Sequence, residues 1–429
     1  MRTTSMTFLG LLALASGGGC KWTEFDDIEA TAWARSVGKP DDKSTNFGGM
    51  IGRGGRSDNT FTTVGTSQMV FQQWSISATG DVSPTTPEEE GLNLTTPTSV
   101  QTFDQQAQLL ADPDSDTISF VLQGLGNEIN VWHGTGAALN IVQVFGVSSP
   151  AGSTFMTPPP ALSGGGTTQT PQVLVAAGDS VYGANLPMAL NPQPKCTLQD
   201  ETGSALTIGA VGAVRLTGTT DDVVAWVKQG TTGKLLLYPG DVFNGFAPRG
   251  PCGSQATPTI TPLANSVAVT TTFAPGPRSR IVRVDEDHVL LVGLAEGTAS
   301  DAYLALFNLT AMNGPNLEPA LVGSAQMVGG MKNAAVLKTA DEMFVAAGFP
   351  EEIVDSNAAA GMVRLYELST TGGVGAVRTT LHDAQPEQNQ QFGRSVSVVQ
   401  YNGQDILIAG ADNELFVYFR TAVYDETRQ

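Results

Sequence analysis

Three carboxylates alternate along one short stretch of the chain, Asp112, Asp114 and Asp116, in a D-x-D-x-D spacing. Carboxylates at this spacing can converge on a hard cation such as Ca²⁺, which prefers oxygen ligands. A calcium loop also needs glycine at its sixth position and glutamate at its twelfth, where this chain has Thr117 and Gln123. The stretch therefore predicts an acidic turn capped by its own side chains, and we assign no metal site.

The three histidines, His133, His288 and His382, are scattered and share no ligand spacing with one another. Neither a G-x-S-x-G nucleophile motif nor an H-E-x-x-H zinc motif occurs. The run Gly52 to Arg56 lacks both the Lys-Ser/Thr of a phosphate loop and a helix after it, so we expect a loop there, between the first two strands of the first repeat. The sequence thus predicts no catalytic residue, no metal and no cofactor, and favours a protein that is not an enzyme.

Cys20 ends an N-terminal segment with one Arg, an apolar run from Phe8 to Ala15 and small residues up to Gly19. The segment resembles a bacterial lipoprotein signal peptide, which implies cleavage after residue 19 and lipidation of Cys20. Ordinary secretion with cleavage nearby is the alternative. Lys21 stands where such lipoproteins carry Asp for retention at the inner membrane, so the resemblance implies the outer membrane. No apolar run is long enough to span a bilayer, so an acyl anchor is the expected membrane connection.

The other two cysteines, Cys196 and Cys252, adjoin Pro- and Gly-rich loops. An even pair in an exported protein predicts a disulfide, and two unrelated free thiols are the alternative. A bond that closes a loop of this length would contribute about 4 kcal/mol in the chain-entropy account.

The formal net charge is −19, with 22 Lys and Arg against 41 Asp and Glu. Nucleic-acid binding needs clustered basic residues that release counterions, and the sequence has no such cluster. The charge also disfavours docking of the folded body on anionic lipid. Solubility is the simplest role of this acidity.

A repeated strand pair must position all these residues. In the last copy, an alternating strand (Arg394 to Gln400) is followed by a turn at Asn402-Gly403, a buried apolar strand (Ile406 to Gly410) and a second alternating strand (Glu414 to Phe419). The same plan recurs six more times, with closing glycines 52 to 63 residues apart. The earlier apolar strands are predicted at Asn59 to Gly65, Ile118 to Gly124, Pro171 to Gly178, Val223 to Gly230, His288 to Gly293 and Met343 to Gly348. Their partners are predicted at Gln68 to Ile76, Glu128 to His133, Ser180 to Leu186, Lys234 to Tyr238, Tyr303 to Phe307 and Met362 to Leu368.

The segments around these strands carry further predictions. Acidic residues before many apolar strands, such as Asp285 to Asp287, predict tight polar turns. Asp81 to Pro97 and Pro150 to Pro171 are rich in turn formers, which predicts loops. Only ten residues follow Phe419, whereas Ile28 to Val37 is strand-like, so we expect the N-terminal strand to complete the last sheet. The tryptophans at 33, 74, 132 and 226 are expected to pack between repeats.

Phe47-Gly48 and Phe392-Gly393 open the first and last copies. With this opening and the strand plan, the chain from Phe47 to Phe419 resembles FG-GAP repeats, the blades of integrin α-like β-propellers; the D-x-D-x-D stretch resembles the calcium loop of some such repeats. The resemblance implies an all-β protein: a signal peptide (1–19), a tether (20–27) and one propeller (28–429) of seven four-stranded blades. A sandwich array, or six blades with one degenerate unit, are the alternatives.

The resemblance also implies a function. It predicts a monomeric, non-enzymatic module, periplasmic or surface-exposed, that binds protein or glycan at the cell envelope without contacting nucleic acid. Two rivals remain at this point: a propeller hydrolase or lyase acting on envelope polysaccharide, and a purely structural part of an envelope assembly.

Overall fold

The computed structural model describes residues 34–38, 50–53, 59–64, 70–86, 92–93, 108–111, 118–123, 129–135, 138–145, 152–156, 172–185, 195–204, 206–216, 221–240, 259–276, 279–293, 302–383 and 385–419. The named elements in these ranges are all β-strands, so the predicted all-β class is confirmed. Within these ranges, no helix is long and apolar enough to cross a membrane.

The first half of the chain forms three sheets and begins a fourth. In spatial order, the first sheet holds β2 (Met50–Arg53), β3 (Thr60–Val64), β4 (Val70–Ile76) and β5 (Val82–Thr86), with β6 (Leu92–Asn93) also on β4. The second holds β10 (Ala138–Phe145), β9 (Ile129–Thr135), β8 (Ile118–Gln123) and β7 (Gln108–Ala111). The third holds β11 (Gly152–Met156), β12 (Gln172–Ala177), β13 (Ser180–Asn185), β14 (Lys195–Leu198) and β18 (Thr259–Ile260).

The second half repeats the pattern. The fourth sheet holds β15 (Thr207–Val214), β16 (Asp222–Gln229), β17 (Thr232–Tyr238) and β19 (Val269–Thr271). The fifth holds β20 (Arg280–Arg283), β21 (His288–Gly293) and β22 (Tyr303–Asn308), with β25 (Ala320–Leu321) and β26 (Gln326–Met327) both on β22. The sixth holds β27 (Asn333–Lys338), β28 (Met343–Phe349), β29 (Met362–Ser369) and β30 (Gly373–Leu381). The last holds β31 (Ser395–Tyr401), β32 (Gln404–Gly410), β33 (Glu414–Tyr418) and β1 (Ala34–Gly38); β23 (Met312–Asn313) and β24 (Asn316–Leu317) form a separate hairpin.

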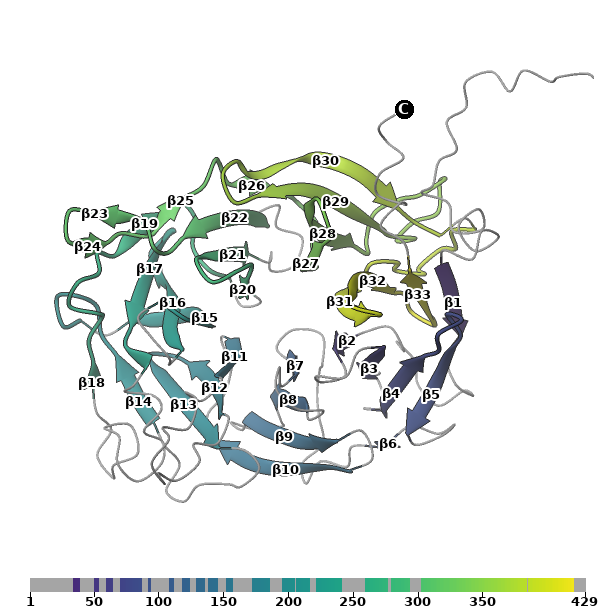
Figure 1. Cartoon of the computed structure of the whole chain (residues 1–429), viewed down its shortest axis with the longest axis horizontal. Coiled ribbons are helices and arrows are strands. Elements are labelled where there is room, and N and C mark those ends of the chain that lie inside the picture. Colours follow the sequence, from purple (N-terminus) through teal and green to yellow (C-terminus); the bar gives the residue numbers. More distant parts are fainter. Residues whose placement is uncertain are drawn as a thin grey trace, which may run out of the picture.

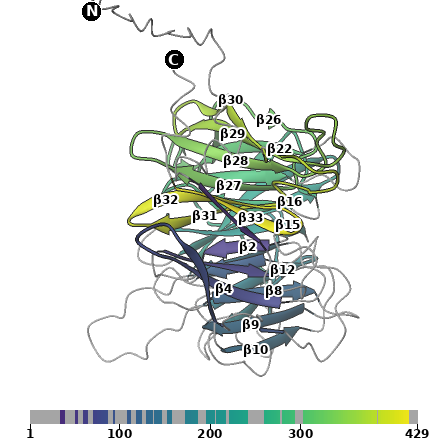
Figure 2. The same ribbon diagram turned by 90° about the vertical axis from the view of Figure 1, so that its right-hand side faces the viewer.

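The sheets follow one another around a common centre in chain order (Figure 1). The strand of each sheet nearest that centre is called its first strand; these are β2, β7, β11, β15, β20, β27 and β31. Neighbouring first strands contact one another, as β2 does with β31 and β7, and β15 with β11 and β20. From the side, the sheets of β27, β31 and β2 lie one after another (Figure 2).

Each predicted strand pair is present as an antiparallel pair. The observed pairs are β3 with β4, β8 with β9, β12 with β13, β16 with β17, β21 with β22, β28 with β29 and β32 with β33. Apolar runs closed by glycine were therefore a sufficient local signal for the central two strands of every sheet.

Parts of three predicted loops are strands. Gly152–Met156 lies inside the predicted loop Pro150 to Pro171, yet it is strand β11 and pairs with β12 along its whole length. Val82–Thr86 lies inside the predicted loop Asp81 to Pro97, yet it is β5 and pairs with β4 despite Pro84. Gly52 belongs to β2. Turn-forming residues do not exclude a strand at these positions, because first and outermost strands have fewer partner strands and tolerate Gly and Pro better than central strands do.

The N-terminal strand lies in the last sheet, as the sequence predicted. β1 pairs antiparallel with β33, from Ala34 opposite Tyr418 to Gly38 opposite Glu414. The observed strand begins at Ala34; the rest of the predicted strand, Ile28 to Trp33, lies outside the described residues. Strands from the two ends of the chain thus share one sheet.

The central strands are apolar at consecutive positions because both faces of each sheet are covered. In β28, Phe344 packs with the last sheet, whereas the next residue, Val345, packs with the fifth. In β32, Leu407 faces the sixth sheet and Ile408 faces the first. Successive side chains of a strand point to opposite faces, so a strand between two neighbours needs no polar position.

Two faces can be defined from the strand directions. The connections from first to second strands, such as Val284 to Asp287 between β20 and β21, lie on one rim, which we call the turn face. The connections from second to third strands, such as Pro350 to Gly361 between β28 and β29, lie on the opposite rim, the crossover face. Because β1 runs antiparallel to β33, its first residue, Ala34, lies at the turn face.

Candidate functional site

Several residues singled out in the sequence lie outside the described part of the chain: Cys20, Cys252, Asp112, Asp114 and Asp116. Lipidation at Cys20 and the acidic turn therefore stay predictions. Among the residues that the structure does describe, no three His, Cys, Asp or Glu side chains gather to hold a metal ion.

Cys196 is disulfide-bonded and fully buried. It lies in β14, within a strand and not at a loop end as its Pro-rich surroundings suggested, opposite Val181 of β13. Its side chain packs in the core between the third and fourth sheets with Val211 and Leu236. The disulfide thus joins the middle of a packed interface, and its pairing with Cys252 stays a prediction.

A second tie joins the same two sheets. β18 follows β17 in the chain but pairs in parallel with β14, through Thr197 opposite Thr259. The chain then returns to the fourth sheet, where β19 pairs with β17. This excursion adds a fifth strand to the third sheet, which four-strand repetition did not predict.

The three histidines lie in three different sheets. His133 lies inside β9 and His288 opens β21, and both are buried. His382 follows β30, and its Nδ1 lies 2.8 Å from the backbone oxygen of Asp383.

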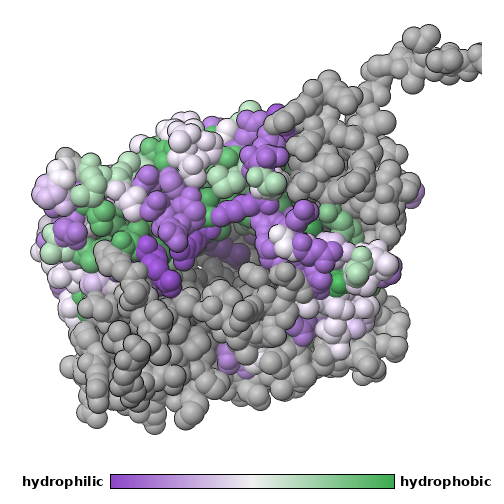
Figure 3. Space-filling model, in the orientation of Figure 1, coloured by the Kyte–Doolittle hydropathy of each residue, from purple (hydrophilic) through white to green (hydrophobic). Residues whose placement is uncertain are grey.

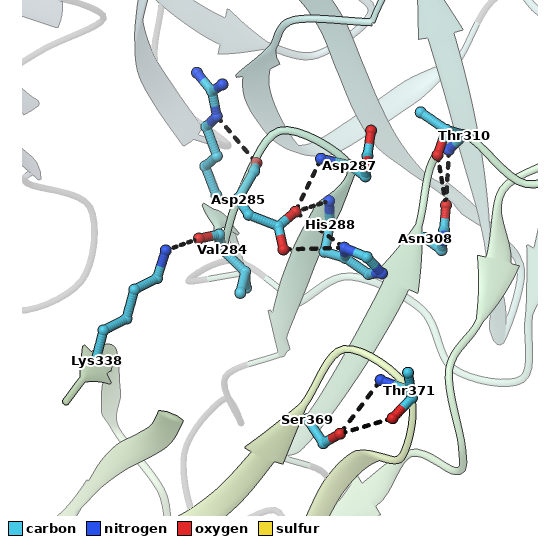
Figure 4. A network of polar contacts seen from close by, with 10 residues as sticks. Val284, Asp285, Asp287, His288, Asn308, Thr310, Lys338, Ser369 and Thr371 are labelled. Atoms are coloured by element: carbon cyan, nitrogen blue, oxygen red, sulfur yellow. Dashed lines mark hydrogen bonds and ion pairs between the residues drawn. The ribbon is translucent and has the colours of Figure 1, made fainter. Parts of the chain in front are cut away.

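The turn before β21 holds the best-organised polar cluster on the turn face. Asp285 accepts hydrogen bonds from the backbone N–H groups of Asp287 and His288, at 2.8 and 2.7 Å (Figure 4). Its carboxylate also lies 2.9 Å from His288 Nδ1. Burial alone raises the pKa of Asp285, but these hydrogen bonds outweigh it and hold the pKa below its ordinary value.

The Asp285–His288 pair has a chemical capacity that it does not use within the described residues. The carboxylate orients the imidazole through Nδ1, while Nε2 is buried and meets no hydrogen-bond partner in the described structure. An oriented histidine of this kind can act as a general base or ligand only if a substrate, nucleophile or metal reaches its second nitrogen. No acidic, thiol or imidazole partner set surrounds it among the described residues.

Polar bonds link the turns of neighbouring sheets along the turn face. Lys338 Nζ donates to the backbone oxygen of Val284, and the Lys338 N–H donates to Asp405 Oδ2 at 3.0 Å. Asp405 also accepts from Gln400 Nε2. These bonds join the fifth, sixth and last sheets, so the acidic turn residues satisfy backbone donors that would otherwise lack partners.

Two asparagines join the last sheet to the first on the same face. Asn402 donates its backbone N–H to Asn59 Oδ1 at 2.8 Å, and Asn59 Nδ2 donates to Asn402 Oδ1 at 3.3 Å. The Asn59 N–H donates to the Gln400 oxygen at 2.7 Å. Both asparagines have positive φ, 65° and 50°, a conformation that Asn tolerates better than most residues. This seam bridges parts of the chain 343 residues apart.

The Phe-Gly opening of the last copy has a defined structural role on the crossover face. Phe392 is fully buried between the sixth and last sheets, with its ring 4.9 Å from that of Phe416. Gly393 has φ +80°, and a Cβ there would lie 2.5 Å from the Met362 oxygen. The backbone of Gly348 also packs against Gly393 with no room for a side chain.

The described tryptophans are buried as expected. Trp226 is fully buried between the fourth and fifth sheets and meets the Tyr303 ring edge to face at 5.5 Å. Trp74 stacks on Phe61 at 6.0 Å in the core between the first and last sheets. These side chains are packing elements and form no exposed stacking platform.

Sequence reasoning missed one feature of the crossover face, the loop Pro350 to Gly361. It contains Ile353, whose exposed fraction of 64% is the largest among the large hydrophobic residues described as exposed. Three residues of the loop other than glycine have positive φ: Asp355, Ser356 and Ala359. The unbroken run of small and polar residues after Val354 is typical of a loop with turn conformations, and no prediction was based on it.

Along the coloured part of the border of the central hollow in Figure 3, hydrophilic side chains gather, while hydrophobic residues lie farther out. A comparison with family models found no match, and no curated protein sequence matches the chain significantly.

Proposed function

We propose that this chain is a lipid-anchored cell-envelope protein with one seven-bladed, FG-GAP-like β-propeller, closed by its N-terminal strand, which binds protein or glycan without catalysing a reaction. The observation that carries the proposal is the succession of antiparallel sheets around one centre, with β1 seated on β33 (Figure 1). A ring of four-stranded blades in which one blade is made from both chain ends leaves only short, protected edges.

The FG-GAP assignment is supported by the surroundings of the Phe-Gly pair. A buried Phe392 fills the space between two sheets, and Gly393 lets the chain enter the next sheet in a left-handed conformation at close range. A repeat that opens with this pair uses both properties at its blade junction. Phe47-Gly48, the other intact copy, lies outside the described residues.

Binding is favoured over catalysis because the ionisable groups of the turn face serve the fold. Asp285 caps its own turn, and Asp405 joins the last sheet to the sixth. Asp285 holds two backbone donors and its pKa is lowered, so it is a poor candidate for proton transfer near neutral pH.

The proposed envelope address is supported by the chemistry of Cys196. A buried disulfide cysteine fits an oxidising compartment, whereas cytosolic chains keep their thiols reduced. We propose that Cys252 is its partner and that Cys20 carries the acyl anchor.

Intact mass spectrometry of the membrane-extracted chain, with and without reductant, tests the anchor and the disulfide together. We expect a mass that begins at Cys20 and includes a diacylglyceryl and an acyl group, and a gain of two hydrogens after reduction. A Cys20→Ala control should lose the lipid mass, and a Cys252→Ser control should lose the reduction step. A processed but unlipidated chain would contradict the anchor, and an unchanged mass after reduction would contradict the disulfide.

A further inference from the structure

The loop Pro350 to Gly361 presents one aliphatic side chain to solvent from a firm base. Ile353 is 64% exposed, whereas its neighbour Val354 is 6% exposed and points into the protein. Phe349, at the end of β28, is fully buried and lies under the Arg364 guanidinium, 4.4 Å from its ring centre. Single exposed apolar side chains are common on protein surfaces, so the interest of Ile353 lies in the anchored loop and the charges that accompany it.

The loop backbone is fixed by the segment that leads into the last sheet. The N–H groups of Asn389, Gln391 and Phe392 donate to the oxygens of residues 358, 359 and 360, at 2.9, 2.9 and 2.8 Å. Asn357 Nδ2 adds a bond of 2.7 Å to the Pro386 oxygen. Sparsely populated conformations persist only where the surroundings impose them, so these bonds explain how Ala359 keeps its positive φ. A loop fixed before binding loses little conformational entropy when a partner docks.

The surroundings of Ile353 are acidic. The loop and its supporting segment, residues 350–361 and 383–391, contain the carboxylates Glu351, Glu352, Asp355, Asp383 and Glu387 and no Lys or Arg. Glu351 pairs with Lys332, which precedes β27, at 3.3 Å, and Glu352 pairs with Arg364 of β29 at 3.2 Å. Asp355 and Glu387 are exposed and form no ion pair within the described residues.

These observations indicate the class of partner. An apolar side chain on a loop that carries, with its supporting segment, two unpaired carboxylates, Asp355 and Glu387, is complementary to a basic segment that offers a small apolar pocket. The same carboxylates would repel an anionic lipid surface. The loop also lies on the crossover face, whereas β1 begins on the turn face, so a tether that enters at Ala34 joins the rim opposite the loop.

We propose that the Pro350 to Gly361 loop is a docking site for a cationic segment of a partner protein, with Ile353 as the buried anchor and Asp355 and Glu387 as the charged rim. This inference rests on the proposed binding function and narrows its ligand to a protein. A docked partner would remove Ile353 from water and would be held in register by the two carboxylates.

Site-specific photo-crosslinking of the full-length chain in membranes of cells that produce it tests the proposal. A benzophenone amino acid replaces Ala358, which is exposed within the loop and has no positive φ to disturb. We expect a crosslink to a protein segment with net positive charge. Ile353→Asp should lower the crosslink yield at least tenfold. Asp355→Asn with Glu387→Gln should lower the yield at low salt and remove most of the decline that the natural chain shows as salt rises; Asn is chosen because it tolerates left-handed backbone.

Val377→Asp is the matched control, because Val377 is 44% exposed on the outer strand β30, away from the loop. Its crosslink yield should stay within twofold of the yield of the probe-bearing chain that has no other substitution. Equal losses in the Ile353 and Val377 variants, or a crosslinked segment without net positive charge, would overturn the proposal. A crosslink to glycan or lipid would overturn it too. If position 358 yields nothing while the same probe on the turn face captures a partner, the docking loop is wrong and the binding function stands.

Discussion

Single glycines decide whether neighbouring sheets can approach. Gly393 combines a left-handed backbone with a Cβ position only 2.5 Å from the Met362 oxygen, so both conformation and space exclude a side chain. Gly403, in the turn between β31 and β32, has a similar φ of +76°, but the position that a Cβ would take there has nothing within 4 Å. The two residues therefore separate the conformational requirement for glycine from the steric one.

Replacing Gly393 by alanine should destabilise the protein much more than replacing Gly403. Gly403→Ala carries the left-handed cost alone, about 1 kcal/mol. Gly393→Ala adds a clash with backbone that cannot move without parting the sixth and last sheets, so we expect a total loss of at least about 3 kcal/mol. Urea unfolding monitored by tryptophan fluorescence measures both. Equal losses would show that the junction is looser than its backbone contacts indicate.

Turns and central strands stabilise each sheet in different ways. Central strands such as β28 and β32 are covered on both faces, so their apolar residues hold the neighbouring sheets together. The turns before them carry the acids, which satisfy backbone N–H groups where the chain reverses. The charged carboxylates therefore stabilise these turns, and the free energy of unfolding should depend on pH.

The Asp285 turn should lose stability in acid. Its pKa lies below the ordinary value of 3.8, so the folded state favours the charged carboxylate. That contribution is present above this value and is lost as pH falls through the folded pKa. The advantage of the natural chain over Asp285→Asn should therefore shrink below about pH 4, and because the side chain is 37% exposed it should stay under about 1 kcal/mol.

Urea unfolding of both chains between pH 3 and 7 measures this effect. Asp287→Asn, two residues along, is the control, because the Asp287 side chain accepts none of the bonds that cap the turn. The same pH dependence in both variants would show that Asp285 acts through general surface charge.

The two ends of the chain meet in one sheet at the scale of the whole molecule. β1 completes the last sheet through β33, and the Asn59 to Asn402 seam joins that sheet to the first. The core between them contains Trp74 and Ile408. Consecutive sheets are adjacent in the chain, whereas the first and last sheets are far apart in the chain and meet across this seam. The seam and β1 should therefore control cooperative unfolding.

Removing β1 should open the molecule at its weakest junction. A chain that begins at residue 39 loses the β1–β33 ladder and should unfold with at least about 2 kcal/mol less stability, because several backbone hydrogen bonds disappear. A chain that begins at residue 28 keeps the ladder and is the control. A synthetic peptide of residues 28–38 should restore the urea midpoint when added in excess, since it binds the folded form. An unchanged midpoint without β1 would contradict a closing role.

The sequence alone determined the central strands and their order. Apolar runs that end in glycine and alternate with half-buried partners are local signals, and each run from β3 to β32 has its observed partner next to it in the chain. It also predicted the place of β1, because a sheet one strand short at the C-terminus requires a strand from elsewhere.

Only the tertiary structure decided features that depend on distant contacts. β11 is a strand in a stretch rich in turn formers because β12 supplies its hydrogen bonds, and β18 joins the third sheet because β14 offers a free edge. The end of the loop that carries Ile353, from Ala358 to Ala360, is held by hydrogen bonds from a segment about thirty residues further along. Local periodicity records which face of a strand is buried, but it carries no information about which distant backbone will satisfy a loop, and that partner determines the surface that the loop presents.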